Sequence, residues 1–127
     1  VDTVPYLMKA KQPYNISVAA ETAACVSLGH IDQLKQNQAQ IIAERERLYS
    51  ALDAISWLEP YPSDANFILC RVASVAGIQA AEVKVRLRAQ GILIRHFNKP
   101  GLDDHIRISV GRPGDTDQLL AALDRIE

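Results

Sequence analysis

The stretch Gly91–Gly111, GILIRHFNKPGLDDHIRISVG, decides the fold. Two short apolar runs, Ile92–Phe97 and His105–Val110, flank a seven-residue polar loop that contains a Pro-Gly pair. Apolar runs that are joined by a short glycine-containing loop are typical of a β-hairpin. The stretch therefore predicts two antiparallel strands that belong to a sheet.

Side chains alternate between the two faces of a strand, and this places Ile92 and Ile94 on one face of the first run and Leu93, Arg95 and Phe97 on the other. If the loop closes symmetrically, Phe97 lies opposite His105, and Arg95 lies opposite Arg107. One face of the hairpin then carries both arginines. The opposite face carries Ile92, Ile94, Ile106, Ile108 and Val110.

Arg95 and Arg107 predict an anionic partner, because two positive charges directly opposite each other destabilise a hairpin. A guanidinium is a planar fork whose donors match a carboxylate or a phosphate. The alternative is that both guanidiniums point into water or pair with acids elsewhere, since arginine is mostly a surface residue. We take Arg95 and Arg107 as the candidate residues of an anion-binding site.

Composition excludes several classes of protein. The chain has 127 residues, a net charge of −1 and 48% hydrophobic residues. The near-zero charge argues against a nucleic-acid partner or a polybasic membrane patch, and no apolar run approaches the length of a membrane span. Cys25 and Cys70 lie inside apolar runs, so each predicts a buried, reduced thiol and a reducing compartment. The three histidines show no metal-ligand spacing.

The N-terminal half of the chain predicts two helices. Ser17 is a suitable N-cap for a helix over Val18–Leu28, and Gly29 is a suitable stop. That helix is apolar nearly all round, which is typical of a helix buried on several sides or of one that has lost a neighbour. Apolar spacing predicts a longer helix over Ile31–Ala54. We expect its charged run, Glu44–Arg47, to form a solvated face.

The C-terminal half predicts strands that join the hairpin in one sheet. Trp57–Leu58 is a candidate short strand, and the continuous apolar run within Asn66–Val72 predicts a strand that is covered on both faces. Asn66 is polar and stands beside this apolar run. It is either a turn cap or a functional residue.

Two further helices complete the predicted fold. Gln79–Gln90 predicts a helix whose inner stripe is Ala80, Val83 and Leu87, and Asp115 with Gln118 predicts a capping box for a last helix. The resulting order of elements predicts an α+β domain: a small, mainly antiparallel sheet with helices packed on one face. The sequence contains no glycine-rich phosphate loop and no Ser/His/Asp set.

Several motifs, taken in order, resemble the C-terminal part of the histidinol-phosphate aminotransferase family, which are fold-type I pyridoxal-phosphate enzymes. The matching segments are KQPYNIS at 11–17, ERERL at 44–48, PYPS at 60–63, ANFIL at 65–69, GILIR at 91–95 and IRISVG at 106–111. The resemblance covers essentially the whole chain, and it implies the small domain of such an enzyme. The first residues start in mid-pattern without a methionine, so we expect a piece of a longer protein.

The resemblance implies an activity and a set of site residues. The family is homodimeric and moves an amino group from glutamate to imidazole acetol phosphate, with pyridoxal 5'-phosphate as cofactor. The arginine at the Arg107 position binds the substrate anion, and the arginine at the Arg95 position lies beside it. Asn66, Tyr14 and Asn15 are further candidates for substrate binding, the last two through a loop that approaches the partner subunit's site.

The resemblance also implies what lies outside this chain. None of the five lysines stands in the family's serine-lysine cofactor motif, so we expect no catalytic or cofactor-binding residue here, no bound cofactor and no activity of the chain alone. We expect residues 1–30 to be the crossover segment and helix from the large domain, and residues 31–127 to be the small domain. The compartment is expected to be the cytoplasm, or the plastid stroma in a plant or alga.

Three alternatives remain open at this point. A related aminotransferase of the same fold acts on aromatic or other amino acids, and the residues that select the substrate side chain lie mostly outside this chain. A stand-alone anion-binding α+β module would use the same two arginines. A purely structural or dimerisation domain would present an apolar surface and bind no ligand.

Overall fold

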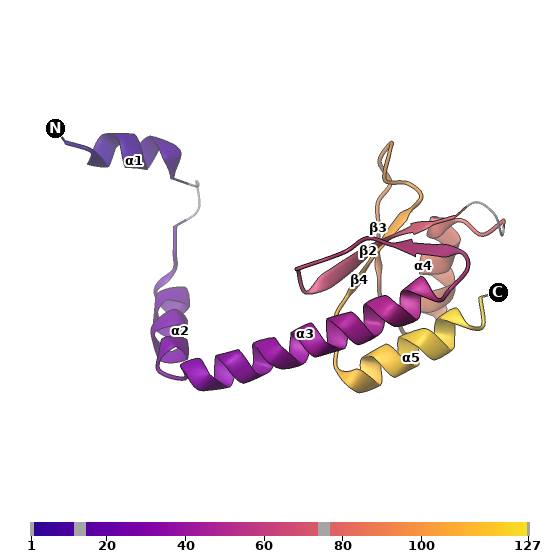
Figure 1. Ribbon diagram of the computed structural model, residues 1–127. Coiled ribbons are helices and arrows are strands. Elements are labelled where there is room, and N and C mark those ends of the chain that lie inside the picture. The colour runs from indigo at the N-terminus through magenta and orange to yellow at the C-terminus, as the bar shows by residue number, and fades with distance from the viewer. Residues whose placement is uncertain (1, 12–14, 74–76, 127) are drawn as a thin grey trace. The chain divides into compact units, whose positions relative to one another are not determined.

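The computed structural model describes residues 2–11, 15–73 and 77–126, and it divides the chain into two units, Val1–Gln36 and Asn37–Glu127 (Figure 1). The boundary between the units falls within the long helix α3 (Ile31–Asp53). Within the described residues the chain forms five helices and one four-stranded antiparallel sheet. None of these helices has the length and apolar character needed to cross a bilayer.

The first unit contains α1 (Val4–Ala10), α2 (Val18–Leu28) and the start of α3. The predicted bounds of α2 are confirmed, because the Ser17 hydroxyl accepts a hydrogen bond from the Ala20 N–H at 3.2 Å. Of the two interpretations of α2, burial on several sides is wrong for this chain, since none of the described residues of this unit is buried, and the interpretation that the helix has lost a neighbour stays open. Cys25 is accordingly exposed rather than buried. Apolar composition shows that a helix has a surface to cover, but it does not show what covers that surface.

The second unit is built on the sheet. Its strands are β1 (Leu58–Pro60), β2 (Phe67–Val72), β3 (Arg95–His96) and β4 (His105–Ser109), in the spatial order β1-β2-β4-β3 (Figure 1). The predicted hairpin is confirmed as the β3–β4 pair. Its first strand is shorter than the apolar run, because the Ile92 N–H donates to the Leu87 carbonyl and thereby closes the preceding helix.

The hydrophobic core lies between one face of the sheet and three helices: the C-terminal part of α3, α4 (Ala80–Ala89) and α5 (Pro113–Leu123) (Figure 1). The predicted inner stripe of α4 is confirmed, since all three of its residues are buried. The main buried side chains are Leu48, Leu52, Ile68, Cys70, Val83, Leu87, Ile106, Ile108, Leu119 and Leu123. The predicted α+β class, with helices on one face of an antiparallel sheet, is therefore confirmed.

Strand β2 differs from its prediction. Ile68, Cys70 and Val72 are buried against the helices, whereas Phe67 and Leu69 on the opposite face are only half-buried. The expectation that this strand is covered on both faces is therefore wrong for this chain. A continuous apolar run indicates a strand that can be covered twice, but the second cover has to come from another part of the protein.

The start of α5 also differs from its prediction. The helix begins at Pro113, a residue suited to a first turn, and Arg112 is the N-cap. Asp115 is therefore the third helical residue rather than the cap, and its carboxylate accepts a hydrogen bond from the Arg112 N–H at 2.9 Å. The capping interaction exists, but it joins Asp115 to the preceding residue Arg112 instead of to Gln118.

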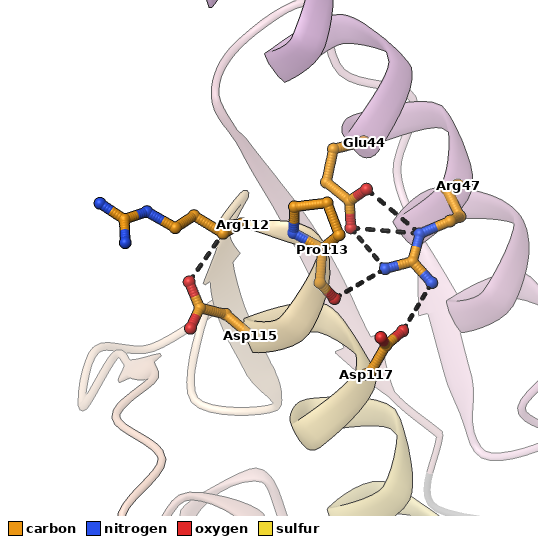
Figure 2. A network of polar contacts seen from close by, with 6 residues as sticks. All are labelled: Glu44, Arg47, Arg112, Pro113, Asp115 and Asp117. Atoms are coloured by element: carbon orange, nitrogen blue, oxygen red, sulfur yellow. Dashed lines mark hydrogen bonds and ion pairs between the residues drawn. The ribbon is translucent and has the colours of Figure 1, made fainter.

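A polar network ties α3 to α5 (Figure 2). The Arg47 guanidinium donates to the Glu44 carboxylate at 2.7 Å, to Asp117 at 2.8 Å and to the Pro113 carbonyl at 2.9 Å. Glu44 is 8% exposed, so the expected solvated face is wrong at this residue. The pKa of Glu44 lies below its usual value because Arg47 and then the Thr116 hydroxyl hydrogen-bond its carboxylate. This burial depends on α5, which is distant in sequence.

Candidate functional site

The sheet has a second face, which we call the open face because α4 and α5 do not cover it. Residues that are opposite each other in register share a face, so the register defines its members. The open face carries Glu59, Phe67, Leu69, Arg71, Arg95, His105, Arg107 and Ser109. It therefore contains both arginines of the predicted anion site.

Arg95 and Arg107 are direct partners in the β3–β4 register, as the alternation of the hairpin predicted. Arg107 is half-buried and Arg95 is exposed. Neither forms an ion pair with an acid among the residues that the structure describes. The alternative in which both guanidiniums pair with acids elsewhere is therefore wrong for these residues, and two neighbouring positive charges remain uncompensated.

The environment of Arg107 leaves the end of its side chain available. Its Nε is buried and has no hydrogen-bond partner within the described residues. The guanidinium lies over the Phe67 ring, with Cζ 5.0 Å from the ring centroid. Arg95 has a similar arrangement, with its Cζ 5.6 Å from the centroid of the Phe97 ring. Both guanidiniums are thus held against aromatic rings rather than against carboxylates.

Arg71 and His105, which also belong to the open face, already have partners. Arg71 donates to the Glu59 carboxylate at 3.0 Å, and this contact raises the pKa of Arg71. His105 stacks on the Tyr61 ring, and its Nδ1 lies 2.5 Å from the Asp104 carboxylate. An incoming anion therefore meets uncompensated positive charge only around Arg95 and Arg107 among the described residues of this face. Sequence reasoning missed the Arg71–Glu59 pair because it depends on the β1–β2 register, and it missed the Tyr61–His105 contact because the two residues are distant in the sequence.

The remaining candidate residues have separate positions. Asn66 is exposed, in the bend just before β2, and its carbonyl accepts a hydrogen bond from the Val110 N–H at 2.9 Å. Asn15 belongs to the first unit, where its side-chain oxygen accepts from the Lys11 Nζ at 2.6 Å. Tyr14 lies outside the described residues. Only Arg95 and Arg107 are brought into direct register with each other.

The described residues do not fit a cofactor or metal site by themselves. All five lysines, Lys9, Lys11, Lys35, Lys84 and Lys99, are exposed, whereas a lysine that forms a Schiff base is activated by a desolvated or charged setting. No group of three metal-ligating side chains occurs in the part of the chain that the structure describes. Among the described residues, Arg95 and Arg107 therefore remain the candidate groups of this site.

Comparison with known proteins defines the class. The sequence model of the family Aminotransferase class I and II matches residues 2–126, and the chain belongs to this family. Two of its curated relatives are histidinol-phosphate aminotransferases. The protein of Roseiflexus castenholzii is 51% identical over 125 residues, which are 98% of this chain and 34% of that protein. The chloroplastic protein of Nicotiana tabacum is 44% identical over 120 residues, 94% of this chain and 29% of that protein.

The chain thus spans about a third of the length of the curated relatives that it matches. The resemblance that the motifs indicated is confirmed by these relatives.

Solved structures agree with the family and the fold. The histidinol-phosphate aminotransferase of Clostridium acetobutylicum has a TM-score of 0.78 at 30% identity, over 93% of this chain and 36% of that one. A decarboxylase from Sulfurospirillum multivorans has a TM-score of 0.80 at 26% identity, over 98% of this chain and 36% of that one. The histidinol-phosphate aminotransferase of Sinorhizobium meliloti was solved in complex with pyridoxal-5'-phosphate. It has a TM-score of 0.73 at 32% identity, over 82% of this chain and 28% of that one. The fold is therefore shared by more than one reaction.

Proposed function

We propose that this chain is the C-terminal part of a pyridoxal-phosphate-dependent histidinol-phosphate aminotransferase, and that Arg107 and Arg95 bind the anionic end of its substrates. The reaction moves an amino group from glutamate to imidazole acetol phosphate. The observation that carries the proposal is the register pairing of two arginines on the open face, without acidic partners among the described residues. The relatives at 51% and 44% identity support the choice of substrate class.

The two arginines bind the anionic end of the substrate and orient the substrate. Arg107 supplies a fork of donors to a carboxylate or a phosphate, and Arg95 adds a second positive charge beside it. Fixing the anionic end of the substrate aligns its Cα–H bond for removal of the proton, which lowers the entropic part of the barrier. The same pair takes the carboxylate of glutamate and the phosphate of the second substrate in turn. The cofactor, when bound, supplies the electron sink for the amino transfer.

The rest of the proposal concerns the whole protein. Residues 1–30 lead from a large domain, residues 31–127 form the small domain, and the lysine that holds the cofactor lies in the large domain. The complete protein is a homodimer, and the loop with Tyr14 and Asn15 approaches the partner subunit's site. Asn66 contributes to substrate binding from the end of β2. The compartment is the cytoplasm, or the plastid stroma if the source is a plant or alga.

The experiment that tests this function uses the full-length protein that carries this chain, loaded with pyridoxal phosphate. Arg107→Ala is expected to raise KM for both glutamate and the phosphorylated substrate by roughly 10- to 150-fold, since hydrogen bonds to charged groups contribute about 1.5 to 3 kcal/mol. Arg88→Ala, which removes an exposed arginine of α4, is the matched control and leaves both values unchanged. Unchanged KM values in Arg107→Ala would refute the assignment.

The same preparation separates the alternatives. The proposal predicts 2-oxoglutarate formation that depends on imidazole acetol phosphate. Turnover of aromatic keto acids alone would favour a related aminotransferase, and release of carbon dioxide would favour the reaction class of the Sulfurospirillum multivorans neighbour. The 127-residue chain mixed with pyridoxal phosphate is expected to show neither turnover nor a lysine-dependent absorbance band.

A further inference from the structure

We infer that Phe67 and Phe97 are positioning residues that hold the Arg107 and Arg95 guanidiniums by their faces, so that only the edges of the guanidiniums are presented to the substrate anion. This inference rests on the proposed function, because it assigns how the same site is preorganised. The aromatic rings take the place that the Glu59 carboxylate occupies beside Arg71 on the same face.

The placement of both rings follows from the strands. Phe67 is opposite Ser109 in the β2–β4 register, and Leu69 is opposite Arg107. Phe67 is therefore the diagonal neighbour of Arg107, a spacing that an aromatic ring and a long side chain can bridge. Phe97 follows Arg95 by two residues, and its ring lies 5.6 Å from the Arg95 Cζ. Phe67 belongs to β2 and Phe97 directly follows β3, so each arginine has its own ring.

An aromatic ring suits a substrate-binding arginine better than an acid does. A carboxylate would occupy the donors of the guanidinium and compete with the incoming anion, whereas a ring attracts the cation through its π face and leaves the edge donors free. Arg71 on the same face illustrates the contrast, since Glu59 takes its Nε donor at 3.0 Å. Arg107 instead has no acidic partner among the described residues and lies over the Phe67 ring.

The competing explanation is ordinary packing. Phe67 is half-buried and could stabilise the sheet without any effect on Arg107. The two explanations differ in the chemistry that they require at residue 67. Packing requires an apolar side chain of similar volume, whereas positioning of a guanidinium requires a π face.

The test compares Phe67→Leu with Phe67→Tyr in the full-length, cofactor-loaded protein. Phe67→Leu keeps an apolar side chain and is expected to raise KM for both anionic substrates by about 2- to 30-fold, with kcat changed less than KM. Phe67→Tyr keeps the π face and is expected to stay within about twofold of the unmodified protein in KM. Phe97→Leu and Phe97→Tyr repeat the comparison at Arg95.

A second measurement does not depend on turnover. In the 127-residue chain, proton resonances of the Arg107 side chain are expected to lie upfield because they sit over the Phe67 ring, and Phe67→Leu is expected to remove this shift while Phe67→Tyr keeps it. Equal KM values for the Leu and Tyr variants, or the absence of an upfield shift, would overturn the inference. If Arg107→Ala changes neither KM, the proposed function itself fails; if Arg107→Ala raises KM but Phe67→Leu does not, only the aromatic positioning fails.

Discussion

Replacing Glu44 by glutamine is expected to destabilise the second unit, because Glu44 is the buried carboxylate of the network that joins α3 to α5 (Figure 2). Glutamine keeps the shape of the side chain but removes its charge. It also turns an NH₂ group, which can only donate, toward the donors of Arg47. The variant therefore loses a charge-assisted interaction without creating a cavity.

The size of the expected loss of stability depends on how far the side chains of Glu44 and Arg47 are buried in their ion pair. Hydrogen bonds to a charged group contribute about 1.5 to 3 kcal/mol when they are sheltered. The Arg47 side chain is 42% exposed, so solvent screening reduces that value. We expect Glu44→Gln to lower the free energy of unfolding by about 1 to 2 kcal/mol. In a domain of this size each kcal/mol lowers the thermal midpoint by about 4 to 8 °C.

The effect has a defined pH dependence. Because Arg47 and Thr116 lower the pKa of Glu44 in the folded state, the carboxylate contributes stability above its unfolded value of 4.5. That contribution is lost as the pH falls through the folded pKa. The difference in stability between the unmodified chain and Glu44→Gln is thus expected to be constant near neutral pH and to shrink below 4.5.

Urea unfolding followed by far-ultraviolet circular dichroism between pH 3 and pH 7 measures this difference. Glu46→Gln is the matched control, because Glu46 is exposed and its ion-pair partner, Arg45, is its neighbour in sequence. The control is expected to change stability by less than about 0.5 kcal/mol. Equal stabilities of Glu44→Gln and Glu46→Gln at neutral pH would refute the reasoning.

Two further predictions test the packing around the site. Gly111→Ala is expected to destabilise the chain by about 0.5 to 2 kcal/mol, because the new Cβ would come 2.8 Å from the Asp115 Cβ and displace the capping carboxylate. Gly114→Ala is the control, because its Cβ would meet no atom within 4 Å. This control is expected to be neutral or stabilising in the same urea titration. Cys25 is exposed and is expected to react rapidly with a disulfide reagent, whereas burial raises the pKa of Cys70 to about 12. At pH 8 the thiolate fraction of Cys70 is then about 10⁻⁴, so labelling of Cys70 is expected to require unfolding. If a stopped-flow trace showed that both thiols react equally fast, the burial of Cys70 in this fold would be contradicted.

The part of the site that sequence predicts is local. Strand alternation and a short loop are sufficient to place Arg95 opposite Arg107, because register within a hairpin depends only on a few neighbouring residues. The bounds of α2 and the inner stripe of α4 are predictable for the same reason, since capping and helical spacing operate over one or two turns.

The features that sequence did not predict depend on distant segments. Glu44 is buried because α5 covers it, and α5 begins 69 residues later at Pro113. The pairing of Glu59 with Arg71 depends on the β1–β2 register, and the ring beneath Arg107 comes from β2. A charged run or an apolar run in the sequence does not reveal which element will be packed against it, so these contacts require the structure.

The central claim is that Arg107 and Arg95 together bind one anion. The most direct test is a titration of the 127-residue chain with inorganic phosphate, followed through the nitrogen-15 resonances of the arginine Nε groups. If the two arginines bind phosphate together, the Arg107 and Arg95 resonances shift along one common saturation curve, while that of exposed Arg88 does not shift. Resonances of Arg107 and Arg95 that stay in place, or that shift no more than the Arg88 resonance, would contradict this claim.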